Sequence, residues 1–332
     1  MGNVSEAAEV LVDEIEAVGA RIALVREQIG RVIFGQAEVI DETLITLLAG
    51  GHALLIGVPG LAKTRLVETL GTVLGLDDRR VQFTPDLMPA DIIGSEVLEE
   101  SDSGRRSFRF LPGPVFCQLL MADEINRASP RTQSALLQAM QEKQVSVAGT
   151  RHPLPAPFHV LATQNPLEQE GTYPLPEAQL DRFLLQVNVT YPDRAAERRM
   201  LFATTSGTED AASAVMSGNE LMAAQRLVRR LPVGESVVEA ILDLVTSARP
   251  ESTPVPEFKT QIAWGPGPRA SQALMLAVRA RALLQGRLAP SVDDVVALAP
   301  PILRHRMALS FAARADGIDV DAVINRLLEP LR

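Results

Sequence analysis

One stretch decides the fold of this chain: Gly57-Val58-Pro59-Gly60-Leu61-Ala62-Lys63-Thr64. It follows an apolar run, Ala53 to Ile56, and leads into a helical pattern that extends from Lys63 to Leu74. A glycine-rich turn between a buried strand and a helix is the context in which such a turn binds phosphate. Glycines let backbone N–H groups approach a phosphate closely, and the start of the helix adds its positive end. The alternative is a glycine turn that only caps the helix.

The last residues of this stretch add the chemistry of a nucleotide site. Lys63 would bridge the β- and γ-phosphates, and the Thr64 hydroxyl would bind Mg²⁺. One position departs from the usual pattern, since Ala62 stands where a glycine usually precedes the lysine. A methyl group is tolerated there if Ala62 keeps a negative φ, and we expect that conformation.

Two carboxylates follow a second apolar run downstream. Leu119 to Ala122 reads as a buried strand, and Asp123 and Glu124 come directly after it. At the end of a strand Asp123 can hold Mg²⁺ through water, and Glu124 can orient and polarise the attacking water. Such a pair alone is most often a solvated turn. Beside a phosphate loop on an adjacent strand, it predicts an ATP-hydrolysing site.

A polar amide ends a third apolar run. Val160 to Thr163 reads as another buried strand, and Asn165 follows it. There Asn165 could position the water beside the γ-phosphate, whereas the alternative is a plain Asn-Pro turn.

The rest of the chain predicts an α/β domain followed by a helical one. Apolar periodicity predicts an N-terminal helix over 5–30 that ends at Gly30. Strands alternating with helices from residue 31 to 192 predict a parallel sheet flanked by helices. Helical patterning dominates residues 193–332, which predicts a separate C-terminal helical domain. Further strands are expected at 81–84 and 184–189, and further helices at 38–48 and 133–141.

Composition excludes several classes of protein. The net charge of −9 argues against broad binding to nucleic acid. A single cysteine, Cys117, rules out an intramolecular disulfide and a cysteine-based zinc site. The acidic N-terminus has no secretory pattern, and no apolar run reaches the roughly 20 residues of a membrane span. We therefore expect a cytoplasmic protein without a membrane span.

With these elements the sequence resembles an AAA+ ATPase, and specifically the MoxR family. The resemblance covers most of residues 30–190. It is carried by GVPGLAKT (57–64), QFTPDLMPADIIG (82–94), FRFLPGPVF (108–116), ADEINRASPRTQSALLQAMQE (122–142), ATQNP (162–166) and YPLPEAQLDRF (173–183). It implies a P-loop NTPase core with Walker A and Walker B motifs, an all-helical lid, and ATP and Mg²⁺ as cofactors.

The resemblance also implies roles for residues beyond the phosphate loop. Asn165 resembles the first sensor, and Arg269 resembles the second sensor, which contacts the γ-phosphate. Arg182 resembles the arginine finger, which reaches the nucleotide of a neighbouring subunit and suits that role as a permanent planar cation. Arg127 and Arg131 are further candidates for facing the neighbour. The segment Ile33-Phe34-Gly35-Gln36 resembles the one that lines the adenine.

Two insertions read as β-hairpins, at 94–111 and 143–154. In the family such hairpins face the pore of a ring or a partner, and the alternative is a decorative surface hairpin.

The resemblance implies a ring, of six subunits, that remodels, matures or activates a client protein. It also implies an adaptor with a von Willebrand factor A domain, while the client stays unknown. The alternatives are an ATPase subunit like that of magnesium chelatase and a nucleic-acid motor or loader.

Overall fold

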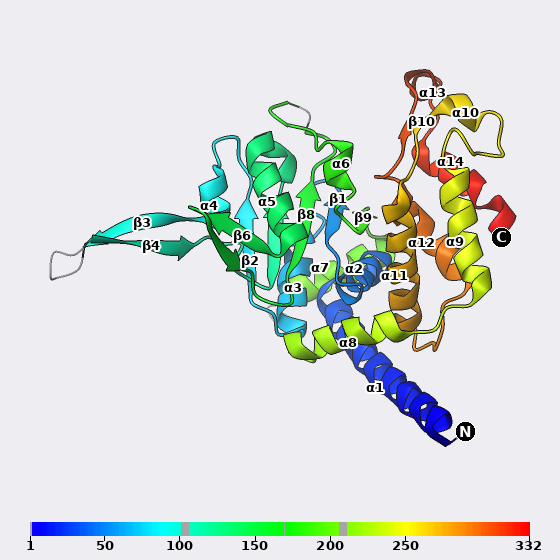
Figure 1. Ribbon diagram of the computed structural model, residues 1–332, viewed down its shortest axis with the longest axis horizontal. Helices are drawn as coiled ribbons and strands as arrows, with labels where there is room; N and C mark the ends of the chain where they lie inside the picture. The colour runs from blue at the N-terminus through cyan, green and yellow to red at the C-terminus, as the bar shows by residue number, and fades with distance from the viewer. Residues whose placement is uncertain (1, 101–105, 169, 206–210) are drawn as a thin grey trace.

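A parallel β-sheet forms the centre of the molecule, with helices on both faces (Figure 1). The computed structural model describes residues 2–100, 106–168, 170–205 and 211–332. Five strands make up this sheet in the order β2-β5-β8-β1-β9, and every neighbouring pair is parallel. Their bounds are Ala53–Ile56 for β1, Asp78–Gln82 for β2, Leu119–Asp123 for β5, His159–Gln164 for β8 and Leu185–Asn188 for β9.

The two faces of the sheet enter two different apolar clusters, because alternate residues of a strand point to opposite sides. Leu55 and Leu119 belong to the cluster that includes α2 and α3, whereas Leu54 and Leu120 pack on the other face with α5. Burial on both faces explains why these strands read as continuous apolar runs. The helices of this domain are α2 (Ala37–Leu48), α3 (Lys63–Val73), α4 (Pro89–Ile93), α5 (Pro130–Glu142), α6 (Glu177–Leu180) and α7 (Arg194–Thr205), with a short 3-10 helix at Ile125–Arg127.

The N-terminal helix α1 spans Gly2–Val32, so the predicted end at Gly30 is wrong. Gly30 lacks the positive φ that would end a helix, and Ile29 and Val32 on either side of it are buried against the core. The chain instead turns at Gly35, where φ is +69°. A Cβ at Gly35 would lie 2.5 Å from the Cβ of Ala196, so a glycine is required there.

The C-terminal half is mostly helical and packs beside β9, the edge strand of the sheet (Figure 1). It differs from the all-helical prediction by one antiparallel strand pair, β10 (Ile262–Trp264) with β11 (Ala308–Leu309). These strands are too short for periodicity to reveal them. The helices are α8 (Gly218–Arg230), α9 (Glu235–Ser247), α10 (Phe258–Gln261), α11 (Pro268–Leu284), α12 (Val292–Leu303), α13 (Phe311–Ala315), α14 (Val320–Leu327) and a 3-10 helix at Glu329–Leu331.

Both predicted hairpins are present as antiparallel pairs. The first, β3 (Gly94–Glu100) with β4 (Arg106–Pro112), projects far beyond the sheet (Figure 1), and residues 101–105 of its predicted tip lie outside the described residues. The second pairs β6 (Gln144–Val147) with β7 (Thr150–Pro153). None of the helices in the described ranges combines the length and apolar character needed to cross a bilayer.

Candidate functional site

The carboxyl end of β1 opens into a pocket of about 440 Å³ that gathers the predicted phosphate-site residues. Lys63 and Thr64 begin α3 directly after the loop, while Asp123, Glu124 and Asn165 follow the neighbouring strands β5 and β8. All five line this pocket, together with loop residues from Pro59 onward. Because the carboxyl ends of parallel strands share one edge of a sheet, residues far apart in sequence meet here.

The glycines of the loop serve different purposes. A Cβ at Gly57 would lie 2.6 Å from the carbonyl oxygen of Val189, so close backbone packing requires the glycine. Gly60 has a φ of +86°, and a Cβ there would meet no atom within 4 Å, so its requirement is conformational.

Ala62 does not have the negative φ that we expected, since its φ is +57° and its ψ is +21°. This is the left-handed region, which costs a residue with a Cβ about 1–2 kcal/mol. The loop must turn here so that α3 can begin at Lys63, and the exposed methyl group of Ala62 tolerates the turn. Glycine would be the unstrained residue at this position.

Lys63 lies folded over the loop that precedes it. Its ammonium donates hydrogen bonds to the carbonyl oxygens of Gly57 and Val58, the latter at 3.3 Å. Burial lowers the pKa of Lys63, and the carboxylates of Asp123 and Glu124 act in the opposite direction. The ammonium is thus placed between the loop and the two carboxylates, where the β- and γ-phosphates of a nucleotide would lie.

Asp123 is buried and has a partner at each oxygen. The Thr163 hydroxyl donates to Oδ1 at 2.6 Å, and the same Thr163 oxygen accepts the backbone N–H of Glu124 at 2.8 Å. Arg80 on β2 donates to Oδ2 from Nη2 at 2.6 Å. Oδ2 therefore already faces a cation.

The pocket fits a Mg²⁺ ion. Asp123 and Thr64 line it together, and their carboxylate and hydroxyl oxygens are the hard ligands that Mg²⁺ prefers. These two residues would hold the metal.

Glu124 is held in an unusual backbone conformation, with a φ of +55°. Its Oε2 accepts hydrogen bonds from Gln82 Nε2 at 2.6 Å and from Arg127 Nη1 at 3.0 Å. Strain of this kind in a non-glycine residue costs about 1–3 kcal/mol and concentrates at functional sites. Arg127 thus pairs with a carboxylate of its own chain, whereas Arg131 is exposed and its proposed role stays a prediction.

Asn165 is buried at the rim of the same pocket, and its Oδ1 accepts the backbone N–H of Leu167 at 3.1 Å. That bond orients the amide and assigns Nδ2 as the donor for a phosphate oxygen or a water.

A second pocket, of about 280 Å³, lies on the other side of the phosphate loop and shares the loop residues 59–62 with the first. Its lining is mainly apolar, so it suits the flat face of a purine base. Of the predicted adenine segment, Phe34 and Gln36 line it, and Gln36 Nε2 donates to the carbonyl oxygen of Thr190 at 2.8 Å. Ile33 is instead buried in the core, and Gly35 makes the turn described above.

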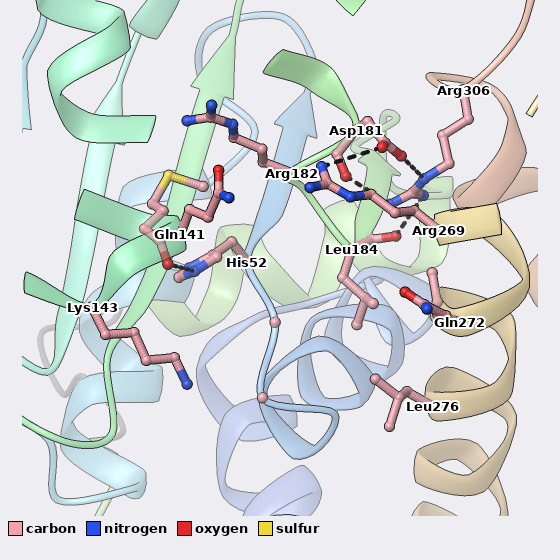
Figure 2. A pocket seen from close by; sticks show the side chains of 14 residues that line it. His52, Gln141, Lys143, Asp181, Arg182, Leu184, Arg269, Gln272, Leu276 and Arg306 are labelled. Carbon is pink, nitrogen blue, oxygen red and sulfur yellow. Dashed lines mark hydrogen bonds and ion pairs between the residues drawn. The ribbon is translucent and has the colours of Figure 1, made fainter. Parts of the chain in front are cut away.

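Arg182 and Arg269 lie elsewhere, in a pocket of about 290 Å³ that shares no lining residue with the phosphate pocket (Figure 2). This pocket also includes Gly51 and His52, which come directly before β1, whereas the phosphate loop comes directly after it. Ala53 pairs with Leu185, so the segment carrying Arg182 reaches the sheet at the amino end of β1. The two pockets therefore lie at opposite ends of β1.

The geometry agrees with comparisons to known proteins. Residues 52–185 match the model of the ATPase family associated with various cellular activities (AAA), and residues 257–327 match the AAA lid domain. The chain is 43% identical over 303 residues to Chaperone MoxR1 of Mycobacterium tuberculosis, a match that covers 91% of this chain and 79% of that relative. This chain belongs to the MoxR family of AAA+ ATPases.

Other relatives span similar lengths. The MoxR-family chain is 34% identical to Protein MoxR of Paracoccus denitrificans over 84% of its own length and 86% of that protein. It is 40% identical to the uncharacterized protein YeaC of Bacillus subtilis, with 92% of each covered. A crystal structure of a protein from Cytophaga hutchinsonii, proposed to be an ATPase, superposes with a TM-score of 0.88 at 38% identity and covers 97% of both chains.

Sequence reasoning missed three side chains of this MoxR site. Arg80 and Gln82 lie on β2, two residues apart and therefore on one side of the strand, next to Asp123 and Glu124. The strand was expected at 81–84, and that shift obscured their register with β5. Thr163 read only as part of a buried strand, although a hydroxyl in such a strand signals a hydrogen-bond partner nearby.

Proposed function

We propose that this MoxR-family chain hydrolyses ATP with Mg²⁺ at a site shared by two subunits of a ring. One observation carries the proposal. Lys63, Asp123 and Glu124 lie at one end of β1, and Arg182 and Arg269 lie in a different pocket at the other end. One chain thus offers a nucleotide pocket without these arginines, and an arginine pocket without a phosphate loop.

Within the nucleotide pocket, each residue has a role that its position supports. The apolar pocket beside Phe34 takes the adenine, and the loop N–H groups with Lys63 take the phosphates. A Mg²⁺ held by Thr64 and Asp123 would neutralise charge on the phosphate oxygens. Glu124 orients and polarises the attacking water.

The arginines complete the site from outside. A guanidinium near the γ-phosphate stabilises the charge that spreads over the transferred group, and it acts equally well when a neighbouring subunit supplies it. A contact that joins two different surfaces of identical chains repeats head to tail and closes into a ring when the rotation allows. Following the family resemblance, we propose six subunits.

The output of hydrolysis is a change in a partner protein. The β3–β4 hairpin supports this part of the proposal, because Leu98 and Phe108 are cross-strand partners and their side chains are 55% and 71% exposed. Such an apolar pair on a projecting hairpin suits contact with a protein. The chaperone name of the 43% identical relative agrees with this role. From the family resemblance we also propose an adaptor with a von Willebrand factor A domain.

A subunit-mixing experiment tests the shared site. Arg182→Ala subunits keep their own phosphate pocket but cannot supply the finger, whereas Glu124→Gln subunits supply the finger but cannot hydrolyse. When the two variants are mixed before ATP is added, the ATPase rate of the mixture should be several times the sum of the rates of the separate variants. Lys63→Ala subunits serve as a second finger donor, in case trapped ATP stalls the ring. Activity equal to the sum with both donors would overturn the shared site.

The partner class has its own test. ATPase activity should rise on adding the adaptor protein and stay unchanged on adding DNA. Stimulation by DNA alone would favour the nucleic-acid motor instead.

A further inference from the structure

The arginine pocket has a third arginine, Arg306, to which the proposed function assigns no role. Arg306, in the lid, is only 3% exposed. A buried guanidinium is costly unless its charge is paired and its N–H groups find acceptors. All three nitrogens of the Arg306 guanidinium donate hydrogen bonds. Nε donates to Asp181 Oδ1 at 2.8 Å, and Nη1 donates to the carbonyls of Leu184 at 3.0 Å and Ile302 at 2.7 Å. Nη2 donates to the carbonyls of Phe183 at 2.6 Å and Asp181 at 3.4 Å.

Most of these acceptors belong to one short segment, residues 181–184, which also contains Arg182. The neighbours of Arg306 reach the same segment and the strand that follows. His305 Nε2 bonds to the carbonyl of Phe183 at 3.0 Å, and Arg304 Nη1 donates to the carbonyl of Gln186 at 3.4 Å. Burial holds the pKa of His305 well below its ordinary value, so its imidazole is neutral and donates from Nε2. The lid therefore contacts the segment that carries Arg182, and the strand β9 that follows it, with three consecutive side chains.

Asp181 links this contact to the second arginine of the pocket. Its Oδ1 accepts from Arg306, and its Oδ2 lies 3.5 Å from Nη1 of Arg269, as Figure 2 shows. One carboxylate thus lies between a fully buried guanidinium and a half-exposed one. Because Arg306 fixes Asp181, Asp181 in turn restrains the direction in which Arg269 points.

We propose that Arg306 is a positioning residue for the neighbouring subunit's ATPase site. It holds the segment that carries Arg182 through the carbonyls of Phe183 and Leu184, and it holds Arg269 through Asp181. This inference rests on the proposed function, in which both arginines act on a neighbour. A pair fixed to both the lid and β9 arrives at the γ-phosphate together or not at all. The lid position of one subunit then sets the hydrolysis rate of the next.

Lysine cannot replace Arg306 in this role. Arginine presents five N–H donors in a fixed plane, whereas lysine offers three donors on one atom. Arg306→Lys keeps the charge beside Asp181 but cannot reach the carbonyls of Phe183, Leu184 and Ile302 at once. Asp181→Asn is the milder change, because the amide oxygen still accepts from Arg306 while the loss of charge releases Arg269.

The test compares these variants with a matched lid variant. Asp294 is a fully buried carboxylate of the lid. Like Asp181 it holds two arginines, Arg281 and Arg287, the latter at 2.5 Å, but it does not line the arginine pocket. Asp181→Asn and Arg306→Lys should lower kcat about tenfold to a hundredfold, as expected for misplaced catalytic groups. Their KM and their affinity for ADP should change less than about twofold, because their own phosphate pocket is intact. Asp294→Asn should lower the unfolding temperature but leave kcat within about twofold.

Mixing distinguishes positioning from general damage. Asp181→Asn subunits mixed with Glu124→Gln or Lys63→Ala subunits should recover ATPase activity several-fold above the sum of the separate proteins, since the donors carry an intact arginine pair. If Arg306→Lys does not fold, Asp181→Asn decides the link from Asp181 to Arg269, without which Arg306 cannot position that arginine.

Several outcomes would overturn the proposal. They are a kcat for Arg306→Lys or Asp181→Asn within twofold of the parent, a loss that donor subunits do not restore, or the same restorable loss in Asp294→Asn. The mixture with Arg182→Ala distinguishes a failure of the positioning role from a failure of the shared site. If Arg182→Ala is restored while Asp181→Asn is not impaired, the shared site stands and only the positioning role is wrong. If Arg182→Ala is not restored, the shared site itself fails.

Discussion

Arg80 directs both Nε and Nη2 at a single oxygen of Asp123, at 3.1 and 2.6 Å, on the residue that would help hold Mg²⁺. A guanidinium and a metal ion compete for the same negative charge. Arg80 must therefore move when the metal binds, or share the carboxylate with it.

The first prediction follows from that competition. Arg80→Gln should lower the Mg²⁺ concentration for half-maximal ATPase activity about threefold to tenfold, because Asp123 no longer gives up an ion pair. The measurement is a Mg²⁺ titration of turnover at saturating ATP. Arg79→Gln is the control, since Arg79 is its exposed neighbour on β2 and only approaches Asp77 at 4.0 Å. An unchanged or higher Mg²⁺ requirement would contradict the competition between Arg80 and the metal.

A second prediction separates nucleotide binding from hydrolysis. Lys63→Ala should abolish ATP binding, since it removes the cation between the loop and the carboxylates. Glu124→Gln should bind ATP but hydrolyse it at least about a hundredfold more slowly. Fluorescent-nucleotide binding and phosphate release measure the two steps. Normal turnover in Glu124→Gln would contradict its assigned role.

Two glycines give a third prediction, on stability. Gly30→Ala should raise the free energy of unfolding by about 0.5–1 kcal/mol, because Gly30 lies within α1 and nothing lies near its missing Cβ. Gly35→Ala is the opposite case, since φ is +69° there and the new Cβ would meet Ala196 at 2.5 Å. Urea denaturation of both variants should shift the midpoint in opposite directions. A midpoint for Gly30→Ala below that of the parent would contradict the assignment of α1.

The fourth prediction concerns pH. Burial lowers the pKa of His52 to about 3 and that of His159 to about 4, and it holds that of His305 well below its ordinary value. Below about pH 6.5 the unfolded chain binds protons that the folded chain refuses, so stability falls with the pH, by up to about 1.4 kcal/mol per pH unit for each histidine. Glu42 acts in the opposite sense, because burial raises its pKa to about 8. Burial also raises the pKa of Asp41 and of Asp78, which act in the same sense as Glu42. We expect the three histidines to dominate between pH 6.5 and 5.

Denaturation midpoints at pH 7, 6 and 5 measure this effect. The midpoint should fall between pH 6.5 and 5, and His305→Gln should make the fall shallower. A midpoint that rises toward pH 5 would show that Glu42 dominates.

Much of the phosphate site was predictable because parallel strands end at one edge of a sheet. Lys63, Asp123 and Asn165 each follow a recognisable buried strand, so their meeting required only the fold class. The order of the strands could not be predicted from the sequence. The contacts of Arg80 and Gln82 with Asp123 and Glu124 depend on that order, because they require β2 to lie beside β5. The φ of Ala62 also escaped prediction, because the backbone of the loop is dictated by where α3 must begin and not by the alanine itself.

The arginine pocket was predictable only in part. Arg182 and Arg269 were identified by resemblance, but their shared pocket requires the lid to be placed in space. Arg306 is 125 residues from Asp181 in sequence, and no local pattern distinguishes a buried arginine from a solvated one. Contacts of this kind depend on tertiary packing.

The placement of the two pockets at opposite ends of β1 has a consequence for gene dosage. In the proposed ring, each copy of the chain would own one reaction centre and supply the arginines of another. A copy that has lost both Lys63 and Arg182 should therefore silence two centres for every place it takes. In a cell making normal and doubly defective copies in equal amounts, about a quarter of the centres would work, and not half.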